Sequence, residues 1–217
     1  MLQWPRGGVL QVPGLKGTVK KASFLATGKA VKFARQKGLL TLALPALPPD
    51  APHTVIALSF RGPVKAEAAA FPVYPNLVNE LHAPFAALRG CEHGKPRWME
   101  KFGDWHHVEA AQRLATGSEI EWRFNALGKG LFELSLEYDC LPEGDGSELE
   151  VEAGMTRFAF PVFCTGTRHE KRFRFRTETL GVAMLDKLGP QRLVLRALEI
   201  KGTDALSIAK LILSPVE

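Results

Sequence analysis

The residue types best suited to sugar recognition fall in one short stretch that lacks a regular apolar period. Two tryptophans there are accompanied by charged and polar side chains, and the set is Arg97, Trp98, Asp104, Trp105, His106 and His107. Proteins bind neutral sugars by laying an aromatic ring against the C–H face of the sugar, while polar groups hydrogen-bond its hydroxyls. We therefore predict a carbohydrate site here. The alternative is that both indoles fill the end of a hydrophobic core.

Metal and nucleophile chemistry have little support in the sequence. His106 and His107 are adjacent, whereas ligand pairs on one strand or helix face are two or four residues apart. The three cysteines, Cys91, Cys140 and Cys164, show no metal or redox spacing, and their redox state stays open. No nucleophile elbow, phosphate-binding loop or obvious carboxylate pair is present. We predict no metal site and no catalytic residue.

A basic, aromatic run follows at Lys171–Arg176. As a strand, it would place Phe173 and Phe175 on a core face and its arginines on the outer face. A nucleic-acid binder would instead gather aromatics and cations on one surface. The net charge of +5 is small, so no nucleic-acid partner is expected. Contact of the arginine row with sulfated or acidic glycans is a further alternative.

Period-two alternation fills most of the chain. It predicts strands at 30–33, 39–44, 54–60, 119–124, 131–138, 148–152, 157–163, 191–200 and 205–213. Residues 106–114 are expected to form a short helical turn, and Trp122 to lie in the core. Short strands with turn residues between them are typical of antiparallel sandwiches. We predict an all-β chain of two jelly-roll-like β-sandwich domains, residues 1–62 and 63–217, without a catalytic barrel.

Ordered motifs along both halves resemble one enzyme family. In the first half they are Trp4–Gly8, Val12–Lys16, Val19–Leu25, Gly28-Lys29, Leu44–Asp50 and Val55–Leu58. In the second half they are Gly103–Trp105, Glu121–Phe124, the strand up to Tyr138, Gly146–Val151, Thr165-Gly166, Leu180-Gly181 and Leu211–Pro215. Together they are similar to the C-terminal, non-catalytic region of glycoside hydrolase family 29 α-L-fucosidases. There a small β-sandwich precedes a module of the family-6 or family-35 carbohydrate-binding type.

The resemblance implies an accessory role in carbohydrate metabolism. The family's catalytic acids lie on a (β/α)₈ barrel of about 200 residues or more, which this chain has no room for. It would therefore not be an enzyme on its own, and would bind glycans or brace the catalytic domain. The expected partners are a glycan, including fucosylated glycans, and a missing or separate catalytic barrel domain. The alternative is a purely structural, protein-interaction module without a sugar site.

Calcium and location follow from the same comparison. Such modules often hold calcium through acidic residues of the first strand, but the matching stretch here, Leu81–Ala86, carries Pro84 and Phe85 in those places. The acidic turn of Asp139, Glu143, Asp145 and Glu148 is better interpreted as solvated, so calcium stays an alternative and no cofactor is predicted. No apolar run suits a membrane span and residues 1–6 are no signal peptide, although the resemblance implies a periplasmic or secreted parent.

Overall fold

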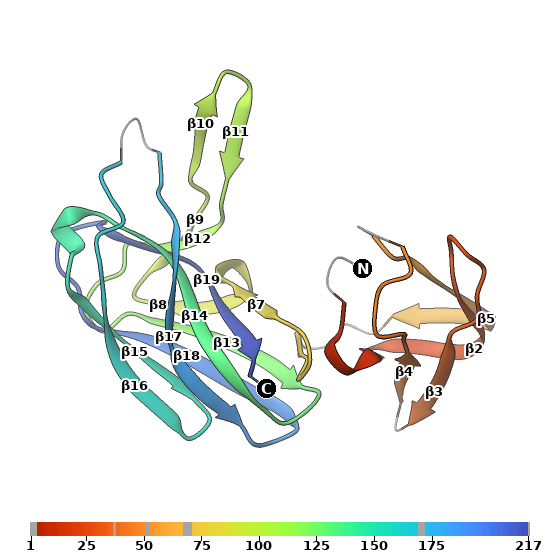
Figure 1. Ribbon diagram of the computed structural model, residues 1–217. Coiled ribbons are helices and arrows are strands. Elements are labelled where there is room, and N and C mark those ends of the chain that lie inside the picture. Colours follow the sequence, from red (N-terminus) through yellow and green to blue (C-terminus); the bar gives the residue numbers. More distant parts are fainter. Residues whose placement is uncertain (1–3, 37, 51–52, 67–70, 169–171, 217) are drawn as a thin grey trace.

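The computed structural model describes residues 4–36, 38–50, 53–66, 71–168 and 172–216 of the 217-residue chain. Within these ranges the regular structure is strand, apart from three short 3-10 turns at Arg6–Gly8, Ala83–Phe85 and Pro142–Gly144. No helix in these ranges has the length and apolar content to cross a membrane. The strands form a smaller body from the first third of the chain and a larger body from the rest (Figure 1).

The larger body is a sandwich of two six-stranded sheets. One sheet has the order β17-β14-β19-β12-β9, and β7 also pairs with β19. The other has the order β16-β15-β18-β13-β6, and β8 also pairs with β13. The bounds of the first sheet are β7 Asn79–His82, β9 Glu92–Gly94, β12 Ala110–Gln112, β14 Gly130–Cys140, β17 Arg176–Leu185 and β19 Leu206–Pro215. Those of the second are β6 Pro72–Val73, β8 Ala86–Arg89, β13 Glu119–Ala126, β15 Ser147–Ala153, β16 Thr156–Val162 and β18 Gly189–Glu199.

Alternating apolar residues of the two sheets meet in one core. On β14 the side chains of Phe132, Leu134 and Leu136 are fully buried, as their period-two spacing predicts. Trp122 on β13 is 1% exposed, which confirms its expected core position, and its indole Nε1 donates to the His82 carbonyl at 2.9 Å. Each such large side chain contributes about 1.5–3 kcal/mol on burial. The predicted all-β sandwich fold is thus confirmed.

The smaller body has its own core of five buried residues, Ala22, Phe24, Val31, Leu40 and Leu42. Its strands are β1 Val9–Val12, β2 Leu15–Phe24, β3 Lys32–Gln36, β4 Leu39–Ala43 and β5 Ile56–Ala66, arranged as β1-β4-β3 and β2-β5. The strand β5 continues past Gly62 to Ala66, beyond the position expected for the domain boundary. The division into domains at residue 62 remains a prediction.

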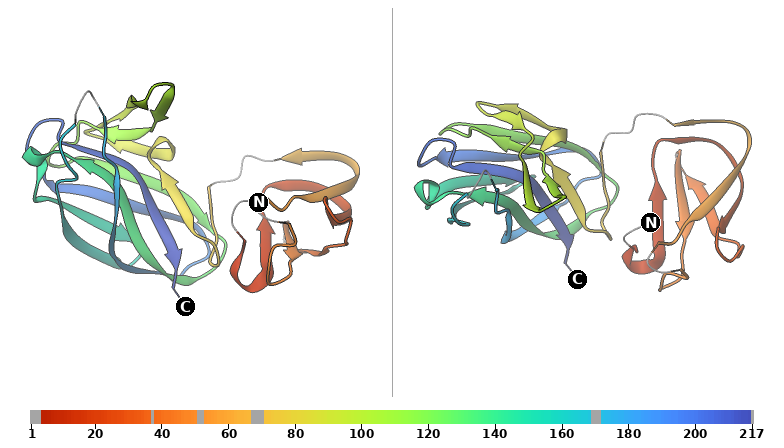
Figure 2. Two further views of the ribbon diagram at one scale, coloured as in Figure 1. Left: turned by 45° about the horizontal axis from the view of Figure 1, so that its top comes forward. Right: turned by 90° about the horizontal axis from the view of Figure 1, so that it is seen from above.

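A narrow polar seam joins the two bodies, which lie side by side in both views of Figure 2. The Asn76 side-chain amide donates to the carbonyl oxygens of Arg6, at 2.7 Å, and of Val9, at 2.9 Å. Arg6 in turn donates from its backbone N–H to the Asn76 carbonyl at 3.0 Å, and from its guanidinium to the Pro215 carbonyl at 3.2 Å. The seam thus ties the start of the chain to the end of the last strand.

Two of the predicted elements are wrong. No helical turn spans residues 106–114, because β11 spans Asp104–His107 and β12, Ala110–Gln112, pairs with β9 and β19. Residues 172–175 are not a strand, since β17 begins only at Arg176. The Arg174 backbone N–H donates to the Asp139 carboxylate at 2.6 Å instead of to a ladder partner. A side chain thus captures the donor that a strand would have used.

Candidate functional site

A β-hairpin that projects from the larger sandwich holds all six predicted sugar-site residues (Figure 1). Its strands are β10, Arg97–Lys101, and β11, Asp104–His107. Gly103 lies in the turn at a φ of 82°, a left-handed conformation that favours glycine. In the register of the hairpin, Trp98 faces His106 and Met99 faces Trp105. Since side chains alternate along a strand, this register assigns each residue to one of two faces.

The register separates the predicted residues into two groups of three. Trp98 and His106 are on one face, where the Asp104 carboxylate lies 3.7 Å from His106 Nε2. Arg97, Trp105 and His107 are on the other face, since Arg97 pairs with His107. The two tryptophans therefore do not form a single site.

On its first face the hairpin packs against the segment 172–175. The Trp98 ring stacks on His106 at 5.5 Å between ring centroids, and lies 5.9 Å from Phe173 and 6.4 Å from Phe175. Trp98 is 9% exposed, so it fills a small aromatic core as the alternative interpretation of the indoles expects. An open groove of about 540 Å³ lies beside these rings. Its lining, which we call the Trp98 groove, is Trp98, His106, Val108, Arg172, Phe173, Arg174 and Phe175.

Phe173 and Phe175 thus share one groove with Arg172 and Arg174, contrary to the expected separation of aromatic and basic residues onto opposite faces. The reason is that residues 172–175 form no strand, so their alternating sequence does not place the arginines and the phenylalanines on opposite faces. Both phenylalanines are half-buried against Trp98, Arg172 is half-buried and Arg174 is exposed.

A buried carboxylate holds this segment in place. The Asp139 side chain is fully buried, and its Oδ2 accepts from Arg168 Nε at 2.8 Å and Nη2 at 2.5 Å. Its Oδ1 accepts from the Arg174 backbone N–H. The Arg168 guanidinium also lies 4.1 Å from the Phe173 ring centroid. Asp139 therefore links the end of β14 to the floor of the Trp98 groove.

On the second face of the hairpin the aromatic rings are more open. Trp105 is 46% exposed, and the Arg97 guanidinium lies over its ring at 4.0 Å from the centroid. His107, two residues along the same face, lines an open groove of about 510 Å³. The lining of this groove, which we call the Phe85 groove, is His82, Pro84, Phe85, His107, Val108, Glu109, Glu137, Ala209 and Lys210.

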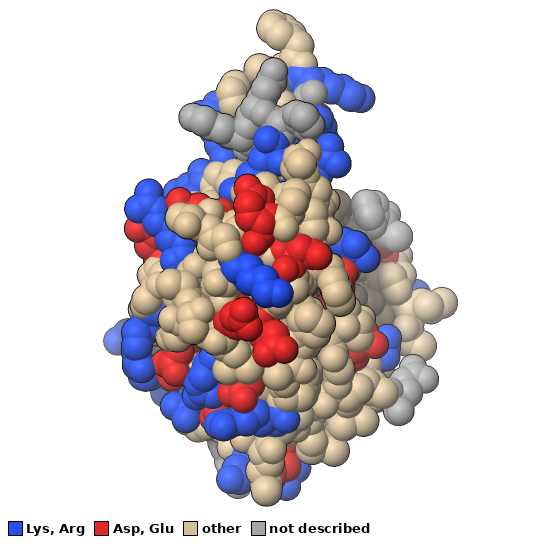
Figure 3. All heavy atoms as spheres, turned by 90° about the vertical axis from the view of Figure 1, so that its left-hand side faces the viewer, with Lys and Arg blue, Asp and Glu red and all other residues tan. Residues whose placement is uncertain are grey.

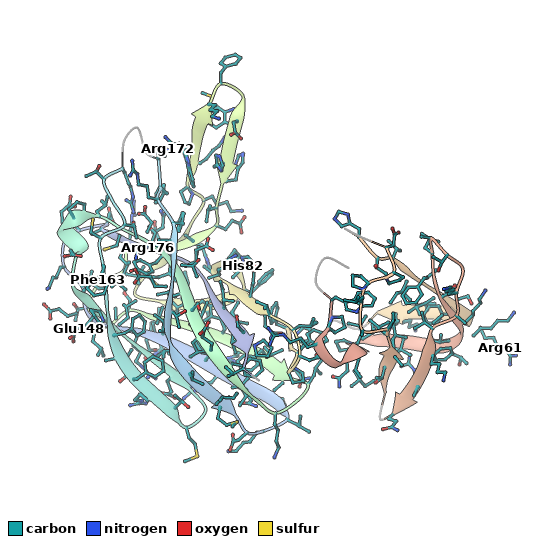
Figure 4. The ribbon with its side chains drawn as sticks, viewed as in Figure 1. Arg61, His82, Glu148, Phe163, Arg172 and Arg176 are labelled. Carbon is teal, nitrogen blue, oxygen red and sulfur yellow. The ribbon has the colours of Figure 1, made fainter. Side chains whose placement is uncertain are left out.

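The Phe85 groove combines an open ring with fixed charges. Phe85 is 66% exposed, on the 3-10 turn that follows β7. Lys210 Nζ lies 3.1 Å from the Glu80 carboxylate and 3.3 Å from that of Glu137, and His82 Nε2 lies 3.0 Å from Glu80. Burial alone would lower the pKa of Lys210, but its hydrogen bonds and charge interactions with both glutamates raise it. Figure 4 shows His82 on β7, below the projecting hairpin.

Other charged groups are engaged within the fold. The acidic turn is not solvated throughout, contrary to expectation, because Asp139 is fully buried and binds Arg168, and Asp145 Oδ1 accepts from the Cys164 backbone N–H at 2.7 Å. The described residues contain no group of three or more metal-ligating side chains. Acidic and basic side chains are interspersed over the middle and lower part of the face shown in Figure 3, whereas its upper end shows basic side chains.

Sequence reasoning missed the residues that make the second groove. The sequence pattern marks Phe85 only as a residue that replaces a calcium-binding carboxylate. It marks Glu137 and Lys210 only as residues of predicted strands. One signal was available: Phe85 directly follows Pro84, and proline favours a turn. An aromatic side chain in a turn does not belong to the alternating buried face of a strand.

Known proteins resemble this chain in fold but not in sequence. No family model matches the chain, and no curated protein sequence matches it. The crystal structure of an α-L-fucosidase from Vibrio sp. strain EJY3 is similar over 99% of this chain and 37% of its own, with a TM-score of 0.51 and 16% identity. This chain therefore spans little more than a third of that protein.

Two further solved structures resemble parts of this chain in fold. A Bacillus thuringiensis Cry1Da tryptic core variant has a TM-score of 0.50 at 12% identity, over 88% of this chain and 31% of its own. A carbohydrate binding module from Cellvibrio mixtus lichenase 5A, solved with cellotriose, has a TM-score of 0.47 at 11% identity, over 64% of this chain and 98% of its own. At such identities the likeness concerns the fold, which supports different functions in different proteins.

Proposed function

We propose that the larger sandwich is a glycan-binding module and that the Phe85 groove is its binding site. One observation carries this proposal: the 66% exposed ring of Phe85 stands beside charged side chains whose positions are already fixed by ion pairs. The exposed ring offers a stacking surface for the C–H face of a sugar. The Lys210, Glu137 and His107 side chains offer donors and acceptors for its hydroxyls.

The arrangement favours binding and not cleavage. A preorganised polar wall loses little side-chain entropy when a sugar binds, which makes a shallow groove useful for recognition. Glycoside hydrolysis needs one carboxyl group to act as an acid and another as a base or nucleophile. Here both Glu80 and Glu137 are ion-paired with Lys210. We therefore assign the groove no catalytic role.

We further propose that the chain acts as the accessory region of an α-L-fucosidase-like enzyme. The support is the similarity in fold to the Vibrio fucosidase over 99% of this chain, together with the ordered motifs that resemble fucosidases of this family. In this proposal residues 1–62 and 63–217 are the two domains, a catalytic barrel is the protein partner, and the glycan includes fucosylated ones.

A protein-contact role is the second candidate, and the tip of the hairpin favours it. Phe102 is fully exposed at the turn, and Met99 is 45% exposed on the adjoining strand. Exposed apolar residues that cluster on a projecting element are typical of protein-contact surfaces.

A glycan array probed with the whole chain distinguishes these roles. We expect binding by the wild type and a loss of about tenfold or more for Phe85→Ala, because the stacking surface is gone. Phe163→Ala is the matched control, because Phe163 is 51% exposed but lines neither groove. Binding that is equal in wild type and Phe85→Ala, or absent from both, contradicts the proposed sugar site.

A further inference from the structure

We propose that the Trp98 groove is a second, separate ligand site, and that it binds anionic saccharides that carry sulfate or carboxylate groups. It lies on the opposite face of the hairpin from the Phe85 groove, and the two linings share only Val108. The inference goes beyond the proposed function, because it concerns different residues and a different class of ligand.

The charge of the lining selects an anion. Arg172 and Arg174 line the groove together with His106, and none of the described lining residues is acidic. The Arg174 side chain is exposed and has no ion pair with a described residue. A guanidinium presents paired donors that match the oxygens of a carboxylate or sulfate. Figure 4 shows Arg172 at the upper end of the larger body, near the base of the hairpin.

Carboxylates around the groove are directed to other partners. Asp139 is bound by Arg168, and Glu178 lies 3.0 Å from Arg176. The Asp104 carboxylate, on the same face of the hairpin, lies 3.7 Å from His106. Among the described lining residues, Arg174 is thus an exposed cation that an incoming anion can meet.

The indole that lines the groove carries an unsatisfied donor. Trp98 is nine-tenths buried, and its Nε1 has no hydrogen-bond acceptor among the described residues. A buried donor without an acceptor is uncommon and unfavourable. The Nε1 atom is itself closed off from solvent, so a ligand oxygen would reach it only after the side chains that cover it move apart.

The arrangement of the rings favours a saccharide over a nucleic acid. Binding of single strands relies on open aromatic faces on which bases stack. Here the Trp98 ring is stacked on His106 at an interplanar angle of 13°, and Phe173 on Phe175 at 11°. The Arg168 guanidinium also covers Phe173. The covered ring faces therefore leave no platform on which bases could stack, and the arginines hold the ligand through its anionic group.

The test measures binding of the whole chain to a sulfated galactan oligosaccharide, its desulfated form, single-stranded DNA and inorganic sulfate by titration calorimetry. We expect the sulfated sugar to bind at least about tenfold more tightly than the desulfated one, with an affinity that falls as salt rises. Arg174→Gln should weaken it about fivefold or more, since its guanidinium is lost while its backbone bond to Asp139 remains.

Arg61→Gln is the matched control, because Arg61 is exposed on the smaller body (Figure 4) and tests whether net charge alone explains binding. Equal losses in both variants, equal affinity for both sugars, tighter binding of DNA, or sulfate alone binding as well as the sugar would each overturn the proposal. Phe85→Ala should leave sulfated-sugar binding intact, so a failure of the Phe85 groove is distinguishable from a failure of this one.

Discussion

The two sides of the β10–β11 hairpin use similar residue types in opposite ways. On one side Trp98 is nearly buried and the arginines line the groove. On the other side Phe85 and Trp105 are open, while Lys210 is ion-paired with glutamates. An aromatic residue serves as core where its faces are stacked and as a platform where they are free. The exposure of the aromatic rings and the ion pairs of the charged side chains, more than the residue types, therefore decide what each groove can bind.

The largest expected effect is the loss of stability on removal of Asp139, which lies below the Trp98 groove, compared with removal of Lys210, which lines the Phe85 groove. Asp139→Ala should lower the free energy of unfolding by about 3–5 kcal/mol, because it removes a fully buried carboxylate and leaves the largely buried Arg168 cation without that partner. Lys210→Ala should lower it by only about 1 kcal/mol, because its partners Glu80 and Glu137 are partly exposed and can be solvated. Urea unfolding of both variants measures the contrast, and equal losses would show that the two charge clusters are equivalent.

The next largest effect is a difference in stability between the variants Trp98→Ala and Phe85→Ala. Trp98→Ala should reduce stability by about 2 kcal/mol, since a nearly buried indole is removed from a stack with His106 and Phe173. Phe85→Ala should change it by less than about 0.5 kcal/mol, since the ring is largely solvated. Thermal unfolding is the measurement. A large loss of stability in Phe85→Ala would contradict the assignment of Phe85 as a binding residue.

A smaller effect is expected at the Arg97–Trp105 pair. Arg97→Ala removes a cation from the ring face, where such contacts contribute about 0.5–1 kcal/mol at exposed sites. The freed face of Trp105 should then become more accessible to quenchers. Acrylamide quenching of tryptophan fluorescence, with Arg123→Ala as an exposed-arginine control, follows this change. Unaltered quenching would show that the guanidinium does not cover the indole in solution.

We expect the smallest effect from pH: glycan binding by the Phe85 groove should not change between pH 7 and pH 9. The pKa of Lys210 is raised, so its charge, and the stability it contributes, is fully present below the pKa of an unfolded lysine and is lost only as the pH rises through the still higher folded value. Glycan affinity of the Phe85 groove should therefore be the same at pH 7 and pH 9. A clear fall over this interval, measured by titration calorimetry, would contradict the ion-paired state of Lys210.

The strands of the larger sandwich could be predicted because burial follows a local pattern. The spacing of Phe132, Leu134 and Leu136 requires one apolar face, whatever strand lies next to it. Residues 172–175 alternate equally well but form no strand, because the Asp139 carboxylate takes the Arg174 backbone N–H. A pattern of two-residue period fails where a distant side chain competes for the backbone.

The candidate site was predictable in its location but not in its organisation. Residues 97–107 contain the hairpin, yet the separation of Trp98 from Trp105 depends on the pairing of Met99 with Trp105. A shift of one residue would have put other side chains on each face. Phe85 and Lys210 come from elements more than a hundred residues apart in the sequence, and only β7 pairing with β19 brings them together.

The sequence by itself determined an all-β chain, the apolar faces of its strands and the stretch in which aromatic and polar residues gather, because these follow from the spacing of neighbouring residues. Only the tertiary structure decided which rings are buried, which face of the hairpin each residue occupies and which charges pair. Those outcomes depend on strand register and on contacts such as Arg168 with Asp139, which join residues that no local pattern connects.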